Sequence, residues 1–248
     1  MQRRIIIVGA SSGIGEQVAL RFLEKGWRVG IAARREEPLQ ALQARYPKQV
    51  EYETLDITKD DSCDRAASLI ERLGGMDCYL HVSGIGFQNM TLDKEIELKT
   101  VKTNAEGMVR MVNQAWHYFE EKRGGHIAVV SSIAGTKGLG VAPAYSATKA
   151  MQNCYLESLD QLSRMRDLNI RITDIRPGFV ATNLLNGDQH YPLMMDAESV
   201  SRSIYRAIIK HKRKVVIDYR YSLLVLLWRL IPSALWVRLK IRTKSKRS

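Results

Sequence analysis

Tyr145 and Lys149 are separated by four positions in the stretch Ala-Tyr-Ser-Ala-Thr-Lys-Ala. Residues four apart on a helix share one face, so this spacing places an ammonium one turn from a phenol. A free phenol has a pKa near 10 and holds its proton too tightly to exchange it near neutral pH. A fixed cation stabilises the phenolate, and lowering the pKa by about three units requires roughly 4 kcal/mol. The pair therefore indicates proton-transfer chemistry, although a bare Y-x-x-x-K also arises by chance.

A glycine turn follows the apolar run Ile5–Val8, with Gly9, Gly13 and Gly15 at its positions 1, 5 and 7. Glycine adopts unusual φ values and leaves room for a pyrophosphate near the backbone. A helix that begins in such a turn offers free N–H groups and the positive end of its dipole to phosphates. The turn predicts a dinucleotide-binding site, and the alternative is a tight strand-to-helix turn without a ligand.

The choice of nicotinamide cofactor depends on the end of the second apolar run, where Arg34 and Arg35 follow Ala33. An acidic residue at this point bonds the ribose hydroxyls of NAD, whereas an arginine pairs with a 2′-phosphate. Glu36 and Glu37 come slightly late for the acidic role. We therefore expect NADP(H) rather than NAD(H), with Arg34 the better candidate. The alternative is a solvated pair of arginines.

These motifs together resemble the short-chain dehydrogenase/reductase family, which carries the glycine spacing G-x-x-x-G-x-G, the Y-x-x-x-K pair and a later Pro-Gly. The resemblance extends from about Arg4 to Ile217, with the motifs in the family's order. It implies an NAD(P)-dependent oxidoreductase that interconverts a ketone and a secondary alcohol, with Tyr145 as general acid and base.

The resemblance also implies further site residues. The family's catalytic serine lies thirteen residues before the tyrosine, which selects Ser132 over Ser131. Asn104 matches an asparagine that helps carry a water-linked proton path to the lysine, although a structural amide bonded to backbone is an equal alternative. The implied catalytic residues are Asn104, Ser132, Tyr145 and Lys149. The implied cofactor-binding residues are Gly9, Ser11, Ser12, Gly13, Ile14, Gly15, Arg34, Arg35, Asp56, Ile57, Ser83, Gly84, Tyr145, Lys149, Pro177, Gly178, Val180 and Thr182.

One motif departs from the family pattern. Relatives carry Asn-Asn-Ala-Gly after the fourth strand, and this chain has His81-Val82-Ser83-Gly84. Gly84 still lets the backbone pass close to the ribose. We expect His81 to hydrogen-bond neighbouring backbone in place of the bracing asparagine rather than to act in catalysis.

Apolar runs typical of buried strands alternate along the chain with segments of helical periodicity. Strands are predicted at 5–8, 29–33, 50–55, 78–82, 127–130, 170–175 and 214–217. Helices are predicted at 14–25, 38–45, 62–73, 144–166 and 199–210, with two more within 92–119. This rhythm predicts a single α/β domain, a doubly wound parallel sheet (Rossmann fold) with helices on both faces. Residues 1–218 would form the catalytic domain, with a lid at about 183–198, and residues 219–248 a tail.

The net charge of +12 is concentrated at the end of the chain. Asp218 is the last acidic residue, and eight later cations account for two thirds of the net charge. The body is therefore only mildly basic, which disfavours a nucleic-acid partner. Three widely spaced cysteines provide neither a metal-ligand pattern nor a disulfide framework. We expect no bound metal and a reducing, cytoplasmic setting.

The lid and the tail suggest what the protein contacts. The lid is apolar through Leu184, Leu185, Tyr191, Leu193, Met194 and Met195. These side chains favour an apolar or lipid-like substrate, and the alternative is that they pack on the core. The tail, 222–248, places tryptophans beside arginines, and its apolar stretch is too short to cross a bilayer. It fits peripheral contact with the inner face of a membrane, or packing against the body or a dimer partner.

The sequence thus predicts NADP(H)-dependent conversion between a small apolar ketone and its alcohol. The alternative is a non-catalytic nucleotide-sensing or scaffold protein on the same fold, which would not need Ser132, Tyr145 and Lys149 together. The resemblance further implies a homodimer or homotetramer.

Overall fold

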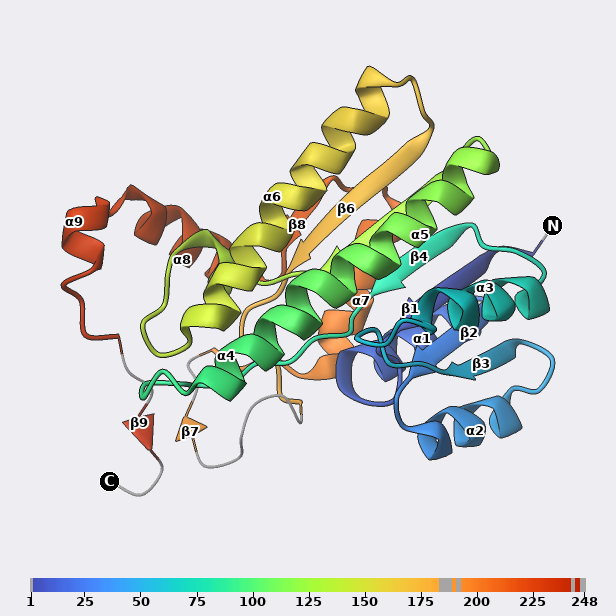
Figure 1. Ribbon diagram of the computed structural model, residues 1–248, viewed down its shortest axis with the longest axis horizontal. Helices are drawn as coiled ribbons and strands as arrows, with labels where there is room; N and C mark the ends of the chain where they lie inside the picture. The colour runs from blue at the N-terminus through green and yellow to red at the C-terminus, as the bar shows by residue number, and fades with distance from the viewer. Residues whose placement is uncertain (1, 183–188, 191–192, 242–243, 246–248) are drawn as a thin grey trace.

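Seven parallel strands form one sheet at the centre of the computed structural model, which describes residues 2–182, 189–190, 193–241 and 244–245. The strands lie in the order β3-β2-β1-β4-β5-β6-β8, so the chain winds outward from β1 in both directions (Figure 1). This is the expected doubly wound arrangement. The bounds are β1 (Arg4–Val8), β2 (Arg28–Ala33), β3 (Val50–Thr54), β4 (Cys78–His81), β5 (Gly125–Val130), β6 (Ile170–Arg176) and β8 (Lys214–Val216).

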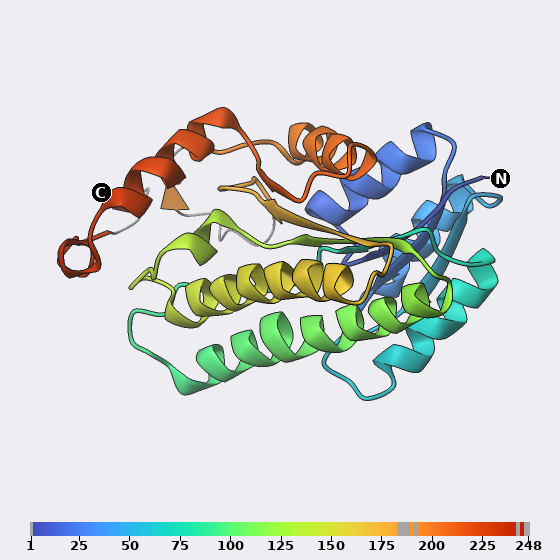
Figure 2. The same ribbon diagram turned by 90° about the horizontal axis from the view of Figure 1, so that it is seen from above.

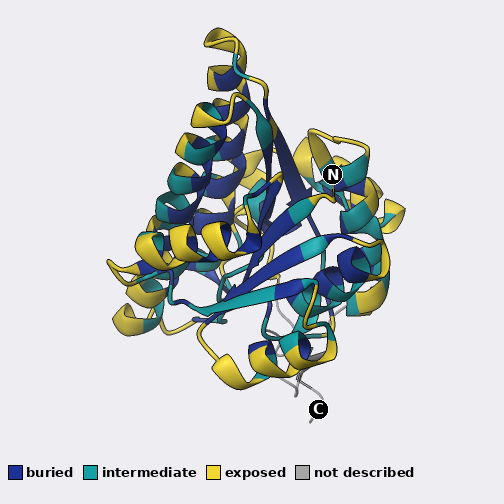
Figure 3. Cartoon of the chain, turned by 90° about the vertical axis from the view of Figure 1, so that its right-hand side faces the viewer, coloured by how far each residue is buried: buried dark blue, intermediate teal, exposed yellow. Residues whose placement is uncertain are grey.

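Helices cover both faces of the sheet, as the alternation of patterns predicts (Figure 2). One face carries α1 (Gly13–Glu24), α2 (Glu36–Arg45) and α7 (Ala197–Ile209). The other carries α3 (Ser62–Leu73), α5 (Met108–Glu121) and α6 (Pro143–Met165). Alternate residues of β1 enter the two cores, Ile5 and Ile7 on one side and Ile6 and Val8 on the other. The sheet is therefore buried on both faces, between helices whose outer sides are exposed (Figure 3).

The segment 92–119 contains the two expected helices, which a π-helical turn joins without a break. It comprises α4 (Lys94–Val101), a π-helical turn (Lys102–Gly107) and α5. Single π-helical turns of this kind occur frequently at functional sites. Asn104 lies in this turn and is completely buried.

Because the strands are parallel, their carboxyl ends meet at one edge of the sheet. The glycine turn follows β1, Ser83 follows β4, and Ser131 follows β5 at this edge. Pro177 follows β6 there as well. The fold therefore gathers motifs that are far apart in the sequence.

The tail forms α8 (Tyr219–Leu230) and α9 (Ser233–Trp236), which extend from the carboxyl edge of the sheet (Figures 1 and 2). Two short strands, β7 (Gln189–His190) and β9 (Lys244–Ser245), pair antiparallel. The expected lid residues 183–188 and 191–192, and the basic residues Arg242, Lys246 and Arg247, lie outside the described residues. Within the part of the chain that the structure describes, every helix is too short or too polar to cross a membrane.

Candidate active site

The glycine turn after β1 is closely packed against the loop after β4. Gly9 has a φ of +98°, and a Cβ atom there would lie 2.5 Å from the Ser83 nitrogen. A Cβ on Gly15 would lie 2.1 Å from the Gly9 carbonyl oxygen. A side chain is thus excluded at Gly9 by the loop after β4 and at Gly15 by the turn's own backbone.

The start of α1 fits a bound phosphate. Ser12 precedes the first turn of the helix, and its side chain makes no capping hydrogen bond. The first N–H groups of α1, from Gly13 and Ile14 onward, are therefore not satisfied by that side chain and are available to an anion. Thr182 lies beside the same turn, since a Cβ on Gly13 would be 3.0 Å from its methyl group. The residues present fit the pyrophosphate of a dinucleotide.

The two arginines after β2 face different neighbours. The Arg35 guanidinium donates to the hydroxyls of Ser12 and Ser11 at 2.8 and 3.1 Å, so it lies against the glycine turn. Arg34 is close enough to Asp56 to influence its carboxylate. Burial raises the pKa of Asp56, but hydrogen bonds from Thr58 and the charge of Arg34 outweigh that effect and lower it. The sequence favours Arg34 for a 2′-phosphate, whereas the geometry favours Arg35.

The two adenine-side residues implied by the resemblance have clear structural roles. Asp56 accepts hydrogen bonds from the backbone and hydroxyl of Thr58 at 3.0 and 2.9 Å, which forms a local turn. Ile57 is buried in the core, and a Cβ on Gly107 would lie 2.8 Å from its side chain. The Ile57 side chain is therefore part of the core packing, and its contact with adenine stays a prediction.

Ser131 and Ser132 point to different surroundings at the end of β5. The Ser131 hydroxyl donates to the Asp174 carboxylate and to the Ile175 carbonyl, which fixes it within the sheet. The Ser132 hydroxyl accepts from the Ala134 N–H at 3.1 Å and lies beside the phenol of Tyr145. The structure therefore brings Ser132, rather than Ser131, next to Tyr145, as the spacing predicts.

Lys149 is buried with 5% of its surface exposed. Its Nζ donates to the Val130 carbonyl oxygen at 3.2 Å and to Gln152 Oε1 at 3.0 Å, and lies 5.8 Å from the centre of the Tyr145 ring. Burial lowers the pKa of Lys149 to about 8, against an opposing effect of the Asp174 charge. The ammonium thus occupies a site where two oxygens replace water.

The pKa of Tyr145 differs from the sequence-based expectation. Burial raises it, and the hydrogen bond with Ser132 only partly offsets that rise. We expected Lys149 to lower it, but the Lys149 ammonium donates its hydrogen bonds to Val130 and Gln152 instead. Tyr145 is therefore a protonated phenol at neutral pH in this arrangement.

Gln152 is a site residue that sequence reasoning missed. Its side chain is completely buried, and its Nε2 donates to the Asn104 carbonyl oxygen at 2.7 Å while its Oε1 accepts from Lys149. It directly connects the two residues for which the resemblance implies a water-linked path. The available signal was a polar residue three positions after Lys149 on the same helix.

The Asn104 side chain holds the loop after β4. Its Nδ2 donates to the Ile85 carbonyl oxygen at 2.7 Å, and its Oδ1 accepts from the Ile85 N–H at 2.8 Å. The backbone of Gly84 passes beside it, since a Cβ there would lie 3.2 Å from Asn104 Oδ1 and 3.8 Å from Lys149 Nζ. Asn104 therefore serves as the backbone-bonding amide that we weighed as an alternative, and its carbonyl is also within the Lys149 network.

His81 replaces the usual asparagine without taking part in this network through a hydrogen bond. Its Nδ1 lies 2.9 Å from the Tyr79 hydroxyl. Burial and the Lys149 charge lower the pKa of His81 to about 3, although a hydrogen bond with the Ser83 backbone opposes this change. It is a neutral, buried imidazole. The side chain of Tyr79 is one partner, and the backbone of Ser83 is a second, so the expected backbone contact is joined by a side-chain contact.

The Pro177-Gly178 loop is positioned by the tail helix. A Cβ on Gly178 would lie 2.3 Å from the Tyr221 ring, and the Phe179 N–H donates to the Tyr221 hydroxyl at 3.2 Å. Val180 is buried and forms a parallel bridge with Met195. The loop that carries the implied nicotinamide contacts is therefore fixed from outside by α8.

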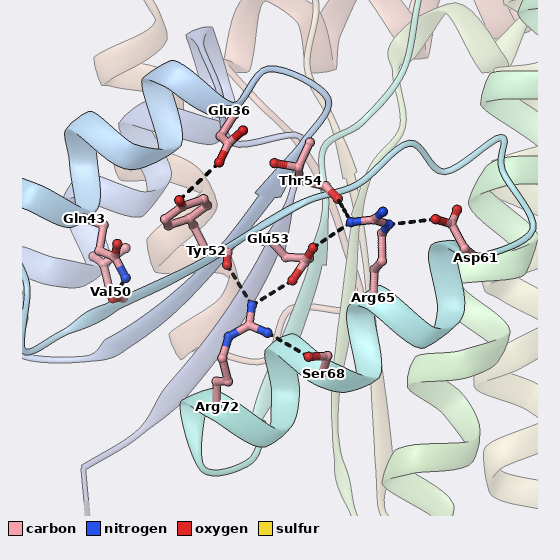
Figure 4. Close-up of polar contacts among 10 residues, drawn as sticks. All are labelled: Glu36, Gln43, Val50, Tyr52, Glu53, Thr54, Asp61, Arg65, Ser68 and Arg72. Carbon is pink, nitrogen blue, oxygen red and sulfur yellow. Dashed lines mark hydrogen bonds and ion pairs between the residues drawn. The ribbon is translucent and has the colours of Figure 1, made fainter.

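A second polar surface lies away from these residues, over the edge strand β3 (Figure 4). It is a hollow of about 600 Å³ between α2 and α3. Its floor is held by Glu53, which pairs with Arg65 and Arg72 at 3.0 and 2.8 Å. These ion pairs attach α3 to the end of the sheet, and the hollow contains none of the implied catalytic residues.

Comparison with known proteins gives a consistent result. The family model for the short chain dehydrogenases matches residues 3–191. An uncharacterized oxidoreductase of Myxococcus xanthus is 30% identical over 243 residues, covering 94% of both chains. A sepiapterin reductase of Chlorobaculum tepidum is 29% identical, covering 87% of this chain and 94% of its own.

Solved structures share the fold at lower identity. A variant of actinorhodin polyketide ketoreductase with NADPH has a TM-score of 0.76 at 21% identity and covers 87% of this chain and 95% of its own. The closed form of a serine dehydrogenase complexed with NADP+ also has a TM-score of 0.76, at 23% identity, covering 86% and 94%. At these identities the likeness concerns the fold.

Burial of the Lys149 charge predicts a pH-dependent stability. Its pKa is about 8 in the folded chain and 10.5 ordinarily, so the folded state releases this proton first as pH rises. The penalty for burying the ammonium is complete below pH 8 and disappears between pH 8 and 10.5. In urea, the free energy of unfolding of Lys149→Met should therefore exceed that of wild type at pH 7. This difference between the two proteins should shrink by about 3 kcal/mol by pH 10. A gap that stays constant with pH would contradict the depressed pKa.

Proposed function

This chain belongs to the short-chain dehydrogenase family of NAD(P)-dependent oxidoreductases, and from that premise we propose that it reduces a ketone to a secondary alcohol with Tyr145 as proton donor. The convergence of Ser132, Tyr145 and Lys149 at the carboxyl edge of the sheet carries this proposal. The Ser132 hydroxyl makes only a long contact of 3.5 Å with the Pro177 carbonyl oxygen, which a substrate carbonyl beside the phenol would replace as its acceptor. The bound nicotinamide would supply the hydride for the carbonyl carbon.

The proton follows a short path in the proposed reaction. As negative charge develops on the carbonyl oxygen, Tyr145 transfers its phenolic proton to that oxygen. The raised pKa keeps the proton on Tyr145 until this charge appears, which suits reduction at neutral pH. Lys149 then stabilises the phenolate from the same helix face until solvent returns a proton. The general base of the reverse oxidation would be the same phenolate.

Gln152 acts in this proposal as a positioning residue. Its Oε1 accepts from the Lys149 ammonium, and its Nε2 is fixed by the Asn104 carbonyl. An acceptor on the ammonium favours the charged form, so Gln152 keeps Lys149 cationic in a buried site.

Preference for NADP(H) is supported by the arginine pair and by the lack of a carboxylate directly after β2. Arg35 lies on the glycine-turn hydroxyls, where it can pair with a 2′-phosphate beside them. Arg34 is the second cation of this site.

An apolar substrate is supported by the described part of the lid. Leu193 and Met194 are large apolar side chains that remain exposed, and the adjacent Met195 is bonded into the body through Phe179 and Ala181. Exposed apolar side chains next to a catalytic edge suit a lipid-like ketone. We propose this class without naming one member.

Removing the phenolic hydroxyl tests the reaction. Tyr145→Phe should lower kcat for NADPH-dependent ketone reduction by roughly 10²- to 10⁴-fold, because the proton donor is lost while the ring remains. NADPH consumption with a panel of apolar ketones measures this effect, and fluorescence titration shows that NADPH still binds. Tyr155→Phe, on the same helix and partly buried, is the matched control and should keep full activity. Equal activity of Tyr145→Phe would refute the mechanism. A wild type that binds NADPH but reduces no ketone would favour the nucleotide-sensing alternative.

Changing Gln152 should move the basic limb of the pH profile. Reduction needs a charged Lys149, so kcat/KM should fall as pH rises through about 8. Gln152→Leu removes a hydrogen bond to an ion and should lower the midpoint pH of this decrease by about one unit. Gln152→Glu should raise the midpoint pH, because it adds a negative charge beside the ammonium. A purely structural Gln152 would change stability but leave the midpoint in place.

Replacing each arginine separately tests the cofactor preference. Arg35→Ala should weaken NADPH binding by roughly 10- to 100-fold, because a charge-assisted contact with the 2′-phosphate is lost. NADH binding should not change. Arg34→Ala should have a smaller effect, and Lys48→Ala serves as a control for loss of one surface charge. Fluorescence titrations measure all four proteins, and tighter binding of NADH than NADPH by wild type would overturn the preference.

A further inference from the structure

The tail presents an apolar surface that the body leaves uncovered. We define the tail surface as the exposed face of 219–241. Only a narrow stripe of α8 is buried, at Tyr221 and Val225, with Trp228 partly covered. The exposed large apolar side chains of this surface are Tyr219, Leu223, Leu224, Leu226, Leu227, Leu230, Leu235, Val237, Leu239 and Ile241. Ten exposed large apolar side chains within one short segment indicate an interaction site.

The tryptophans hold the tail in place rather than forming its outer surface. Trp228 Nε1 donates to the Thr136 hydroxyl at 2.9 Å, and Trp236 Nε1 donates to the Gly138 carbonyl oxygen at 2.7 Å. Lys137 Nζ donates to the Ile231 carbonyl oxygen at 2.8 Å. We expected the tryptophans to serve as an interfacial anchor, but their polar groups are bonded to the body. The leucines are therefore the outward-facing residues, and they lie on a fixed support.

Cations accompany the exposed leucines. Arg229, Arg238 and Lys240 are exposed and belong to none of the ion pairs found among the described residues. Arg220 is different, since it pairs with Asp218. Asp218 is also the last acidic residue of the whole sequence. The tail surface thus combines apolar side chains with uncompensated positive charge.

This charge pattern selects one occupant. If two copies paired through the tail surface about a two-fold axis, the same patch would face itself. The cations of the two copies would then repel each other, because the tail has no acidic side chain after Asp218 to neutralise them. An anionic bilayer offers acyl chains to the leucines and headgroup charges to the cations. The helix α8 has 12 residues, about 18 Å at 1.5 Å per residue, so it suits an in-plane position and not a transmembrane one.

The tail surface also adjoins the catalytic edge. The Tyr221 hydroxyl donates to the Leu193 carbonyl oxygen at 3.1 Å, so α8 contacts the segment that presents exposed Leu193 and Met194. On the other side of the tail, the loop 138–141 contacts Trp236 through the Gly138 carbonyl oxygen. The Val141 carbonyl oxygen of the same loop accepts a hydrogen bond from the Asn89 N–H, and Asn89 is followed by the exposed Met90. Exposed apolar side chains thus lie on the segments next to the tail on both sides.

We propose that the tail surface docks this protein onto an anionic lipid bilayer, with α8 lying among the headgroups and the carboxyl edge of the sheet turned toward the lipid. The proposal rests on the exposed leucines, the unpaired cations and the fixed support, and it holds whatever reaction the site performs.

Co-sedimentation with vesicles tests the docking. The full chain should pellet with vesicles of phosphatidylcholine and phosphatidylglycerol in equal amounts, and much less with phosphatidylcholine alone. Replacing Arg229, Arg238 and Lys240 with Gln should lower the partition coefficient for the anionic vesicles by about 100-fold, as loss of three surface cations implies. The control replaces the exposed Lys48, Lys210 and Lys212 with Gln, removes the same charge, and should bind nearly as wild type.

The apolar contribution is tested by a second matched pair. Leu226→Gln with Leu230→Gln removes side chains that are 59% and 73% exposed, and should weaken binding to anionic vesicles at least tenfold. Leu162→Gln with Met165→Gln makes the same kind of change on the exposed side of α6 and should have little effect. Circular dichroism and NADPH titration verify that every variant is folded.

Three results would overturn the proposal. The first is a wild type that stays in the supernatant with both vesicles, and the second is equal partitioning of the tail variants and their controls. The third is a protein that binds no vesicles and forms a dimer in light scattering, where the Leu226 and Leu230 substitutions dissociate that dimer. The tail surface would then be a contact between two copies of the chain. Loss of reductase activity in Tyr145→Phe leaves each vesicle result unchanged, so docking and catalysis fail separately.

Discussion

The burial of one ammonium, that of Lys149, determines much of the arrangement around it. A cation taken out of water needs oxygen acceptors, because an unpaired buried charge is strongly destabilising. The end of β5 provides one acceptor through the Val130 carbonyl, and Gln152 provides the other from the same helix as Lys149. Gln152 in turn requires an acceptor for its own N–H, which it finds at Asn104 in the π-helical turn. The position of α6 against the π-helical turn and β5 is thus coupled to one charge.

The carboxyl edge of the sheet imposes a second requirement, which is close approach of backbones. Gly9 and Gly15 leave no room for side chains, because the loop after β4 and the turn itself occupy that space. The same packing leaves the start of α1 uncapped and turned toward Arg35 and Thr182. Glu97 adds to this order from α4, since its carboxylate accepts the Ala144 N–H in the first turn of the helix that carries Tyr145. Local rules of helix capping and turn formation therefore set the positions of groups that belong to different motifs.

The order of strands and helices could be predicted from the sequence because it depends on local periodicity. The choice of Ser132 over Ser131 came instead from the spacing that the family resemblance implies. The sequence could not reveal that Arg35, rather than Arg34, reaches the glycine turn. The two arginines are adjacent and identical in type, and only the folded loop determines which side chain points toward the turn. Gln152 was missed for a related reason. Its partners are a backbone carbonyl 48 residues away and a buried ammonium, and only the packed helices bring them together. The pKa of Tyr145 likewise depends on burial, which spacing alone does not measure.

The tail shows how one helix can belong to both the core and the surface. Tyr221 is completely buried, and its hydroxyl contacts backbone on both sides of residues 183–192, at Phe179 and at Leu193. One turn further along, Val225 and Trp228 continue the buried stripe, while the leucines between them point outward. Any force that displaced α8 from the body would therefore act directly on the Pro177-Gly178 loop and on Leu193. The hydrogen bonds of Trp228 and Trp236 oppose such displacement, so the exposed surface of the tail keeps a fixed position relative to the neighbouring site.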